Sequence, residues 1–160
     1  LSLRTTDAGP RLFAWPVREI ESLYRNTQSY TPFELPGISR SFECGGNGLL
    51  DIMVVFENSD AVEFGLTVCG ITVSYHPEAG ELRCKDKTAP LAPEEGKIQM
   101  RLLVDRLSVE IFANKGRVYM PMKHVQENAD GGLEVFAKGG KAAVAGLTVN
   151  ELASAWETDK

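Results

Sequence analysis

The chain has 160 residues and a formal net charge of −5, with 43% hydrophobic and 24% charged residues. This length fits one domain, and the composition is ordinary for a globular protein, which argues against a disordered chain. The acidic balance and the lack of a Lys/Arg cluster give no electrostatic basis for binding nucleic acid, and no apolar run is long enough to span a bilayer. We therefore expect neither nucleic acid nor a membrane as a partner.

The first predicted element is a β-hairpin. Residues 1–6 and 11–15 have the pattern of two short strands on either side of Asp7-Ala8-Gly9-Pro10, whose Gly-Pro pair is typical of a turn. The chain begins at Leu1 without a methionine and without the layout of a secretory signal peptide. We expect it to have been cut from a longer protein, and the sequence leaves the compartment open.

A short connector helix is predicted over residues 17–26. Pro16 suits the first turn of a helix, and apolar residues follow it at helical spacing. Three helix-breaking residues then interrupt the chain: Pro32, Pro36 and Gly37. We predict an N-terminal unit over residues 1–30 and the main domain over residues 31–160.

Alternation of apolar and polar residues dominates the main domain. Leu50, Ile52, Val54 and Phe56 share one face of a predicted strand. Further strands are predicted over residues 62–69, 71–75, 81–85, 97–104, 107–113, 117–122, 133–137 and 142–152, with Leu107, Val109 and Ile111 on one apolar face. The strands are short and joined by tight turns, so we predict an all-β, antiparallel β-sandwich of the lectin-like jelly-roll type, preceded by the hairpin and the connector helix.

The most informative stretch runs over residues 102–114. It contains Val104-Asp105-Arg106, Ser108-Val109-Glu110 and Phe112, and Thr88-Ala89-Pro90-Leu91 precedes it. This pattern resembles the C-terminal β-sandwich module of glycoside hydrolase family 32, the invertases, levanases, inulinases and other β-fructosidases. The resemblance extends over almost the whole chain, because residues 15–23 are similar to the segment that joins the family's catalytic propeller to its sandwich.

Two features depart from the family pattern. Leu107 replaces a serine of the signature, and Lys85-Asp86-Lys87 stands where the family has an Asp-Arg-Ser or Asp-Arg-Thr element. Residues 1–15 correspond to the last strands of the propeller and are expected to have an unpaired edge when severed from it. The family is recognisable, whereas the subfamily is not.

The resemblance implies that the catalytic residues lie outside this chain. Retaining glycosidases need two carboxylates about 5 Å apart, and the family takes them from an Asn-Asp-Pro motif and a Glu-Cys motif in its propeller, with an Arg-Asp-Pro between them. None of these motifs is present in recognisable form, since Phe42-Glu43-Cys44 continues with glycine instead of proline. We therefore predict no catalytic residue in this chain and a parent protein that hydrolyses β-fructosides.

The signature residues are expected to be structural. Asp105 and Arg106 are placed at a hairpin turn, where an aspartate side chain can accept backbone N–H groups. The same role is expected for the rest of the set, which is Ser108, Glu110, Phe112 and Trp156.

The sequence offers no metal site and no cofactor motif. His76 and His124 are far apart and lack ligands at suitable spacing. The odd set of Cys44, Cys69 and Cys84 fits neither a disulfide framework nor a Cys-x-x-Cys site, so we expect small buried residues.

Two functions are kept open for the chain itself. The first is a non-catalytic module that packs beside its own catalytic propeller, supports its stability and contributes to homo-oligomer contacts. The alternative is a carbohydrate-binding module for fructans or other glycans, with Tyr75, His76 and Tyr119 as the candidate contacts. Trp15 and Trp156 are further aromatic candidates, although packing is the simpler explanation for both. A stand-alone enzyme of unrelated chemistry has no motif in its favour.

Overall fold

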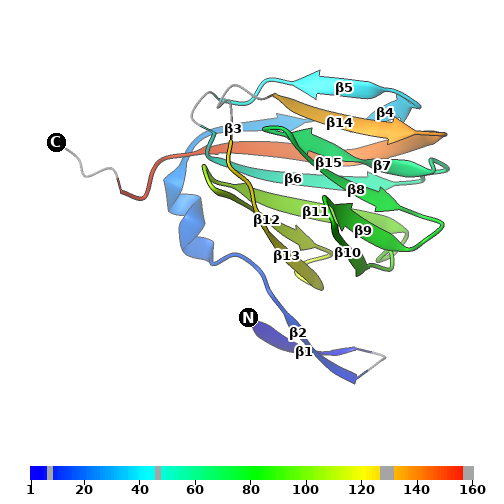
Figure 1. Ribbon diagram of the computed structural model, residues 1–160, viewed down its shortest axis with the longest axis horizontal. Helices are drawn as coiled ribbons and strands as arrows, with labels where there is room; N and C mark the ends of the chain where they lie inside the picture. Colours follow the sequence, from blue (N-terminus) through cyan, green and yellow to red (C-terminus); the bar gives the residue numbers. More distant parts are fainter. Residues whose placement is uncertain (7–8, 46–47, 127–131, 157–160) are drawn as a thin grey trace.

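The computed structural model describes residues 1–6, 9–45, 48–126 and 132–156. Two antiparallel sheets stack face to face, and a separate two-stranded hairpin projects from one side of the stack (Figure 1). This arrangement confirms the predicted all-β sandwich preceded by a hairpin and a short helix.

The larger sheet has seven strands. Its order is β13-β12-β11-β6-β15-β3, and β4 pairs with the other half of β15. Its strands are β3 (Tyr24–Tyr30), β4 (Phe33–Pro36), β6 (Leu50–Glu57), β11 (Lys97–Val104), β12 (Ser108–Ala113), β13 (Val118–Lys123) and β15 (Lys141–Leu152).

The smaller sheet has six strands in the order β10-β9-β8-β7-β14-β5. Its strands are β5 (Ser39–Phe42), β7 (Glu63–Val68), β8 (Ile71–His76), β9 (Glu81–Cys84), β10 (Lys87–Pro90) and β14 (Leu133–Lys138). The chain therefore crosses between the two sheets several times, and strands distant in sequence lie side by side.

The core lies between the two sheets and follows the predicted alternation. Leu50, Ile52, Val54 and Phe56 are each 0% exposed. The facing sheet contributes buried residues of the same kind, such as Leu66 and Val73. Burial of alternate apolar residues from both sheets is what fixes the register of a sandwich, because a slip of one residue would expose every core side chain.

Residue 107 is a correction to the predicted strand pattern. Leu107 was expected on the apolar face of its strand, but it is 65% exposed, and β12 begins at Ser108. The residue belongs to the turn between β11 and β12, where its carbonyl accepts a hydrogen bond from the His124 backbone.

The predicted N-terminal hairpin is present and consists of β1 (Ser2–Thr6) and β2 (Gly9–Phe13). The second strand begins at Gly9, inside the predicted turn, and ends at Phe13 instead of Trp15, while residues 7 and 8 of that turn lie outside the described residues. The connector helix is shorter than predicted. It is a 3-10 helix, η1 (Arg18–Leu23), with no buried residue, and Tyr24 begins β3 of the seven-stranded sheet.

The prediction of helix over residues 24–26 is therefore wrong, because pairing with β15 overrides the local helical spacing. The strands β3, β4 and β5 fill the region that Pro32, Pro36 and Gly37 were expected to interrupt. In the part of the chain that the structure describes, no helix has the length and apolar character to cross a membrane.

Candidate functional site

The three predicted sugar contacts do not come together. Tyr75 lies on β8 in the six-stranded sheet, is 2% exposed and donates its hydroxyl to the Leu91 carbonyl at 3.0 Å. His76 follows it at the strand end, with its Nε2 3.0 Å from the Ser74 hydroxyl. Tyr119 lies on β13 of the other sheet and is 44% exposed. The burial of Tyr75 removes it from the candidates for stacking on a sugar ring.

The signature residues occupy the β11–β12 turn and the strand that follows. The Asp105 side chain accepts a hydrogen bond from the Arg106 backbone N–H at 2.7 Å, and the Asp105 backbone N–H donates to the Ser108 carbonyl at 2.8 Å. On β12, Glu110 accepts a hydrogen bond from the Tyr119 hydroxyl at 3.2 Å. These contacts tie the turn to itself and β12 to β13.

At the two ends of the chain, the tryptophans differ. Trp15 packs edge-on against Phe112, with ring centroids 6.1 Å apart, while Trp156 is 92% exposed. Phe112 in turn stacks on Tyr119 at 5.0 Å. An aromatic row therefore runs across the outer face of the seven-stranded sheet and includes Trp15 but not Trp156.

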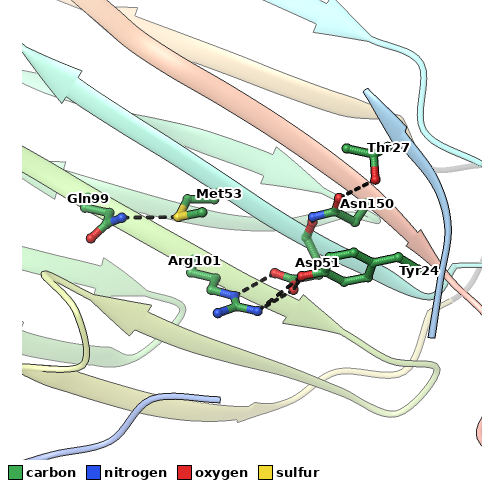
Figure 2. Close-up of polar contacts among 7 residues, drawn as sticks. All are labelled: Tyr24, Thr27, Asp51, Met53, Gln99, Arg101 and Asn150. Carbon is green, nitrogen blue, oxygen red and sulfur yellow. Dashed lines mark hydrogen bonds and ion pairs between the residues drawn. The ribbon is translucent and has the colours of Figure 1, made fainter. Parts of the chain in front are cut away.

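A buried ion pair on that same outer face was not predicted from the sequence. Arg101 on β11 donates from Nε and Nη2 to the two carboxylate oxygens of Asp51 on β6, at 2.9 and 2.6 Å (Figure 2). Such a two-pronged pairing is the strong form of a charged hydrogen bond. Tyr24, the first residue of β3, adds its hydroxyl as a second donor to the carboxylate at 2.6 Å.

Polar contacts continue from this ion pair across the sheet (Figure 2). Asn150 donates to the Asp51 carbonyl at 3.2 Å and accepts from the Thr27 hydroxyl at 2.8 Å. Because these residues come from β3, β6 and β15, the network joins three strands of the sheet. Every buried side-chain nitrogen and oxygen in the described residues has a partner, so the network carries no unpaired buried atom.

Burial and hydrogen bonding change the pKa values of Tyr24 and Arg101. Burial raises the pKa of Tyr24 to about 12, and the hydrogen bond to Asp51 acts in the same direction. For Arg101, burial acts to lower the pKa, but the hydrogen bonds and the charge of Asp51 outweigh it and raise the pKa above its ordinary value. Tyr24 and Arg101 therefore stay protonated at neutral pH and offer no general base.

The linker between the hairpin and η1 is bound to this face. The Arg101 guanidinium lies 5.1 Å from the centre of the Trp15 ring, within the range of a cation–π contact. One residue earlier, the Ala14 backbone N–H donates to the Gly116 carbonyl at 3.0 Å. Gly116 is required here, because a Cβ atom at that position would lie 1.9 Å from the Ala14 carbonyl oxygen.

A crevice separates the hairpin from the sandwich. It has a volume of about 560 Å³ and is lined by Arg11, Leu12 and Phe13 on one side and by Pro90, Leu91, Ala92 and Arg117 on the other. Phe13 is buried, whereas Leu3 and Leu12, which pair across the hairpin, are 69% and 66% exposed. The Phe13 side chain therefore lies toward the sandwich, while the Leu3 and Leu12 side chains remain mostly exposed even though Leu12 borders the crevice.

The cysteines are not in disulfides, and burial raises the pKa of all three thiols, to about 11 for Cys69 and Cys84. A thiol that stays protonated at neutral pH is a poor nucleophile. His124 has Nε2 2.6 Å from the Cys69 carbonyl, which places it in a structural contact. No group of three His, Cys, Asp or Glu side chains within the described ranges is arranged to hold a metal ion.

A family profile and two related sequences indicate the same family of proteins. The sequence profile described as "Glycosyl hydrolases family 32 C terminal" matches residues 19–151. A levanase of Bacillus subtilis (strain 168) is 28% identical over 182 residues, covering 99% of this chain and 27% of the levanase. A second levanase, from Bacillus sp. (strain L7), is 40% identical over 72 residues, which is 45% of this chain and 8% of that protein. The chain spans little more than a quarter of the first of these relatives and much less of the second.

Solved structures share the fold. The exo-inulinase of Aspergillus awamori superimposes with a TM-score of 0.80 at 17% identity, covering 97% of this chain and 35% of the inulinase. The fructan 1-exohydrolase IIa of Cichorium intybus gives a TM-score of 0.72 at 15% identity, covering 94% of this chain and 40% of that enzyme. At these identities the likeness establishes the fold.

Proposed function

The chain belongs to the family of C-terminal domains of glycosyl hydrolases family 32, and on this premise we propose that it supports the catalytic domain of a longer β-fructosidase without supplying catalytic residues. The observation that carries this proposal is the fraction of each relative that the chain covers, 27% of the levanase and 35% of the inulinase. The family's catalytic motifs are also missing from the sequence. The remaining part of the parent protein is the place where the carboxylate pair would lie.

The N-terminal hairpin supports the proposal. An isolated two-stranded hairpin is marginally stable in water and usually needs a further strand or a packing surface. Here, Leu1, Leu3 and Leu12 are between 66% and 92% exposed. We propose that the catalytic domain covers this face and pairs with the open hairpin edge, which would complete the last blade of the propeller.

The boundary between the two units follows from the strand pairing. The predicted division into residues 1–30 and 31–160 stays a proposal, but β3 pairs with β15 through six residue pairs from Tyr24 to Tyr30. We therefore propose to place the boundary after Leu23, at the end of η1. The sandwich would then begin with Tyr24, whose hydroxyl binds Asp51 in the sheet.

A sugar-release assay tests the catalytic half of the proposal. The purified 160-residue chain is incubated with sucrose, inulin and levan, and free fructose is measured against a sample of the parent protein. We expect no release by the chain alone and release by the parent. Fructose release that follows the purified chain through successive columns would overturn the proposal.

A carbohydrate-binding module is the second candidate. The exposed ring of Tyr119 beside the Glu110 carboxylate supports it, because sugars are recognised by an aromatic face next to planar hydrogen-bonding groups. Tyr119→Ala, with Glu78→Ala in the turn between β8 and β9 of the other sheet as a control, tests it by titration with fructan oligosaccharides. If Tyr119→Ala does not weaken binding, the candidate fails at this position.

A further inference from the structure

A second cleft lies on the outer face of the seven-stranded sheet, beside the turn whose Gly116 contacts the linker at Ala14. It has a volume of about 310 Å³ and is lined by Val55, Glu94, Glu95, Lys97, Gln99 and Lys115, with Asn114 beneath them. Pockets that bind small molecules range from about 300 to 1,000 Å³. This cleft is at the lower end of that range, so it suits a ligand of one or two rings.

Two tight turns form the rims of the cleft. In the first, Glu94 and Lys97 exchange both backbone hydrogen bonds at 2.9 Å, and the two residues between them have positive φ angles of 50° and 73°. This is the geometry of a type I′ turn. In the second rim, Asn114, Lys115 and Gly116 have consecutive φ angles of 44°, 55° and 88°. The left-handed backbone of both turns costs free energy and persists because the surrounding structure holds it.

Asn114 holds the rims in place. Its side chain is 1% exposed, accepts a hydrogen bond from the Gln99 backbone at 3.0 Å and donates to the Ala92 carbonyl at 2.8 Å. These two bonds join the second turn to β11 and to the loop that leads into the first turn. The shape of the cleft is therefore fixed before any ligand binds, which lowers the entropic cost of binding.

The side chains that line the cleft suit a neutral, hydroxyl-rich ligand. The lining includes two carboxylates, from Glu94 and Glu95, and two ammonium groups, from Lys97 and Lys115, so their formal charges cancel. The Lys97 ammonium is held by the Glu57 carboxylate at 3.1 Å, beside the cleft. A cleft of this balance does not favour an anion or a cation. Hydroxyl groups can donate to carboxylates and accept from ammonium groups, and hydrogen bonds to charged groups are stronger than neutral ones.

Gln99 adds a planar amide to the floor. Its Nε2 donates to the Met53 sulfur at 3.1 Å, which orients the amide across the sheet (Figure 2). A thioether is a weak acceptor, so this bond is readily exchanged for a stronger one. The half-buried Val55 lies beside it as an apolar surface for the C–H groups of a sugar ring.

We propose that this cleft is a binding site for a neutral saccharide of one or two rings, held by the Gln99 amide and by the charged side chains of the two rims. The proposal goes beyond the supporting role of the domain and does not depend on it. In a parent protein that hydrolyses a polymeric fructan, a saccharide bound here would add a second point of attachment to that substrate. Two linked sites increase the overall affinity for a polymer through effective concentration.

The test is an NMR titration of the whole 160-residue chain with sucrose and with inulin-type and levan-type disaccharides. We expect saturable shifts of the backbone amides of residues 94–99 and 113–116. Gln99→Leu keeps the side-chain volume and removes the amide, and we expect it to weaken binding at least tenfold. Lys115→Ala removes one exposed rim group and should weaken binding several-fold without affecting the fold.

Glu78→Ala and Lys87→Ala serve as matched controls, since both residues are exposed and belong to the other sheet or its turns. They should leave the affinity unchanged. The absence of saturable shifts with all three sugars would overturn the proposal, as would binding that is unchanged in Gln99→Leu and Lys115→Ala. Shifts confined to the surroundings of Tyr119 would also overturn it and would favour the aromatic site instead. None of these outcomes depends on whether the domain stabilises a catalytic partner.

Discussion

Asp51 and Arg101 are charged side chains enclosed almost completely by the sheet and the linker, with exposures of 1% and 8%. A buried pair of this kind contributes little relative to an apolar replacement of both residues, because removing two charges from water is costly. Each charge offsets the free-energy cost of burying the other, so the stability of the fold depends on both residues being present together. Tyr24, Trp15 and the β3–β15 half of the sheet all contact this pair directly or through one residue.

Removing one residue of the Asp51–Arg101 pair should therefore lower the stability of the fold strongly. Asp51→Ala leaves the Arg101 guanidinium buried without its acceptor, and we expect the free energy of unfolding to fall by about 3–5 kcal/mol in urea denaturation. Glu81→Ala, which breaks the half-exposed pair with Arg83, should cost at most about 1 kcal/mol. The double change Asp51→Leu with Arg101→Met should recover most of the loss. A cost below about 1 kcal/mol for Asp51→Ala would contradict this interpretation.

Tyr24 makes alkaline stability a second test of the cluster. Its pKa is raised from 10.0 to about 12 in the folded chain, so folding favours the protonated phenol. This contribution is complete below pH 10 and is lost as the pH rises from 10 to about 12. We expect the difference in unfolding free energy between the wild type and Tyr24→Phe to shrink across this window.

The comparison uses urea denaturation of both proteins at pH 8, 10 and 11. Deprotonation of Cys69 and Cys84, whose pKa values are about 11, affects both proteins equally and cancels in the difference. If the difference in unfolding free energy between the two proteins stays constant from pH 8 to 11, folding does not raise the pKa of Tyr24.

At the scale of single elements, the linker between β2 and η1 depends on one glycine. Gly116 has a φ of 88° and leaves no room for a side chain against Ala14. Gly80 also has a positive φ, 62°, but no atom within 4 Å of its missing Cβ. The same substitution at Gly80 and at Gly116 therefore separates the free-energy cost of a left-handed backbone from the cost of displacing the linker.

We expect Gly80→Ala to destabilise the chain by about 1–2 kcal/mol, the usual cost of a left-handed residue. Gly116→Ala should cost more and should also release the Ala14 amide, which hydrogen exchange measures directly. Equal protection of the Ala14 amide in both variants would refute the role assigned to Gly116.

Strand β6 could be predicted from the sequence, whereas the start of β3 could not. The alternation from Leu50 to Phe56 predicts both a strand and its buried face, since it depends on side chains close in sequence. By contrast, the first residues of β3, 24–26, were included in a helical spacing and are strand because β15, more than a hundred residues later, pairs with them. The turn assignment of Asp105 followed from local chemistry and was correct in its backbone contact.

The buried Asp51–Arg101 pair on the outer face could not be predicted from the sequence. Asp51 and Arg101 lie at outward positions of two strands, where charged residues are ordinarily solvated. Only the pairing of β6 with β11, and the linker folded over them, makes the pair buried. Tyr75, in contrast, shares the core-facing side of β8 with Ile71 and Val73, so the alternation of that strand already indicates its burial, and the Leu91 carbonyl accepts its hydroxyl there.

At the scale of the whole molecule, the exposed leucines of the hairpin are the surface where the proposed contact with a catalytic domain can be tested. We expect Leu3→Thr with Leu12→Thr to change the unfolding free energy of the isolated chain by no more than about 0.5 kcal/mol, because both side chains are exposed. In the parent protein the same changes should lower the melting temperature of the catalytic domain. Equal effects in the two contexts would show that the hairpin face has no partner.

The central claim is that the sandwich stabilises a catalytic domain and takes no part in the chemistry. The most direct measurement compares the half-life of fructan hydrolysis at elevated temperature for the parent protein, for the catalytic domain alone, and for that domain mixed with this chain. We predict a similar initial rate in all three, rapid inactivation of the domain alone, and protection when the chain is added. An unchanged half-life without the chain, or an initial rate that falls to zero without it, would contradict the claim.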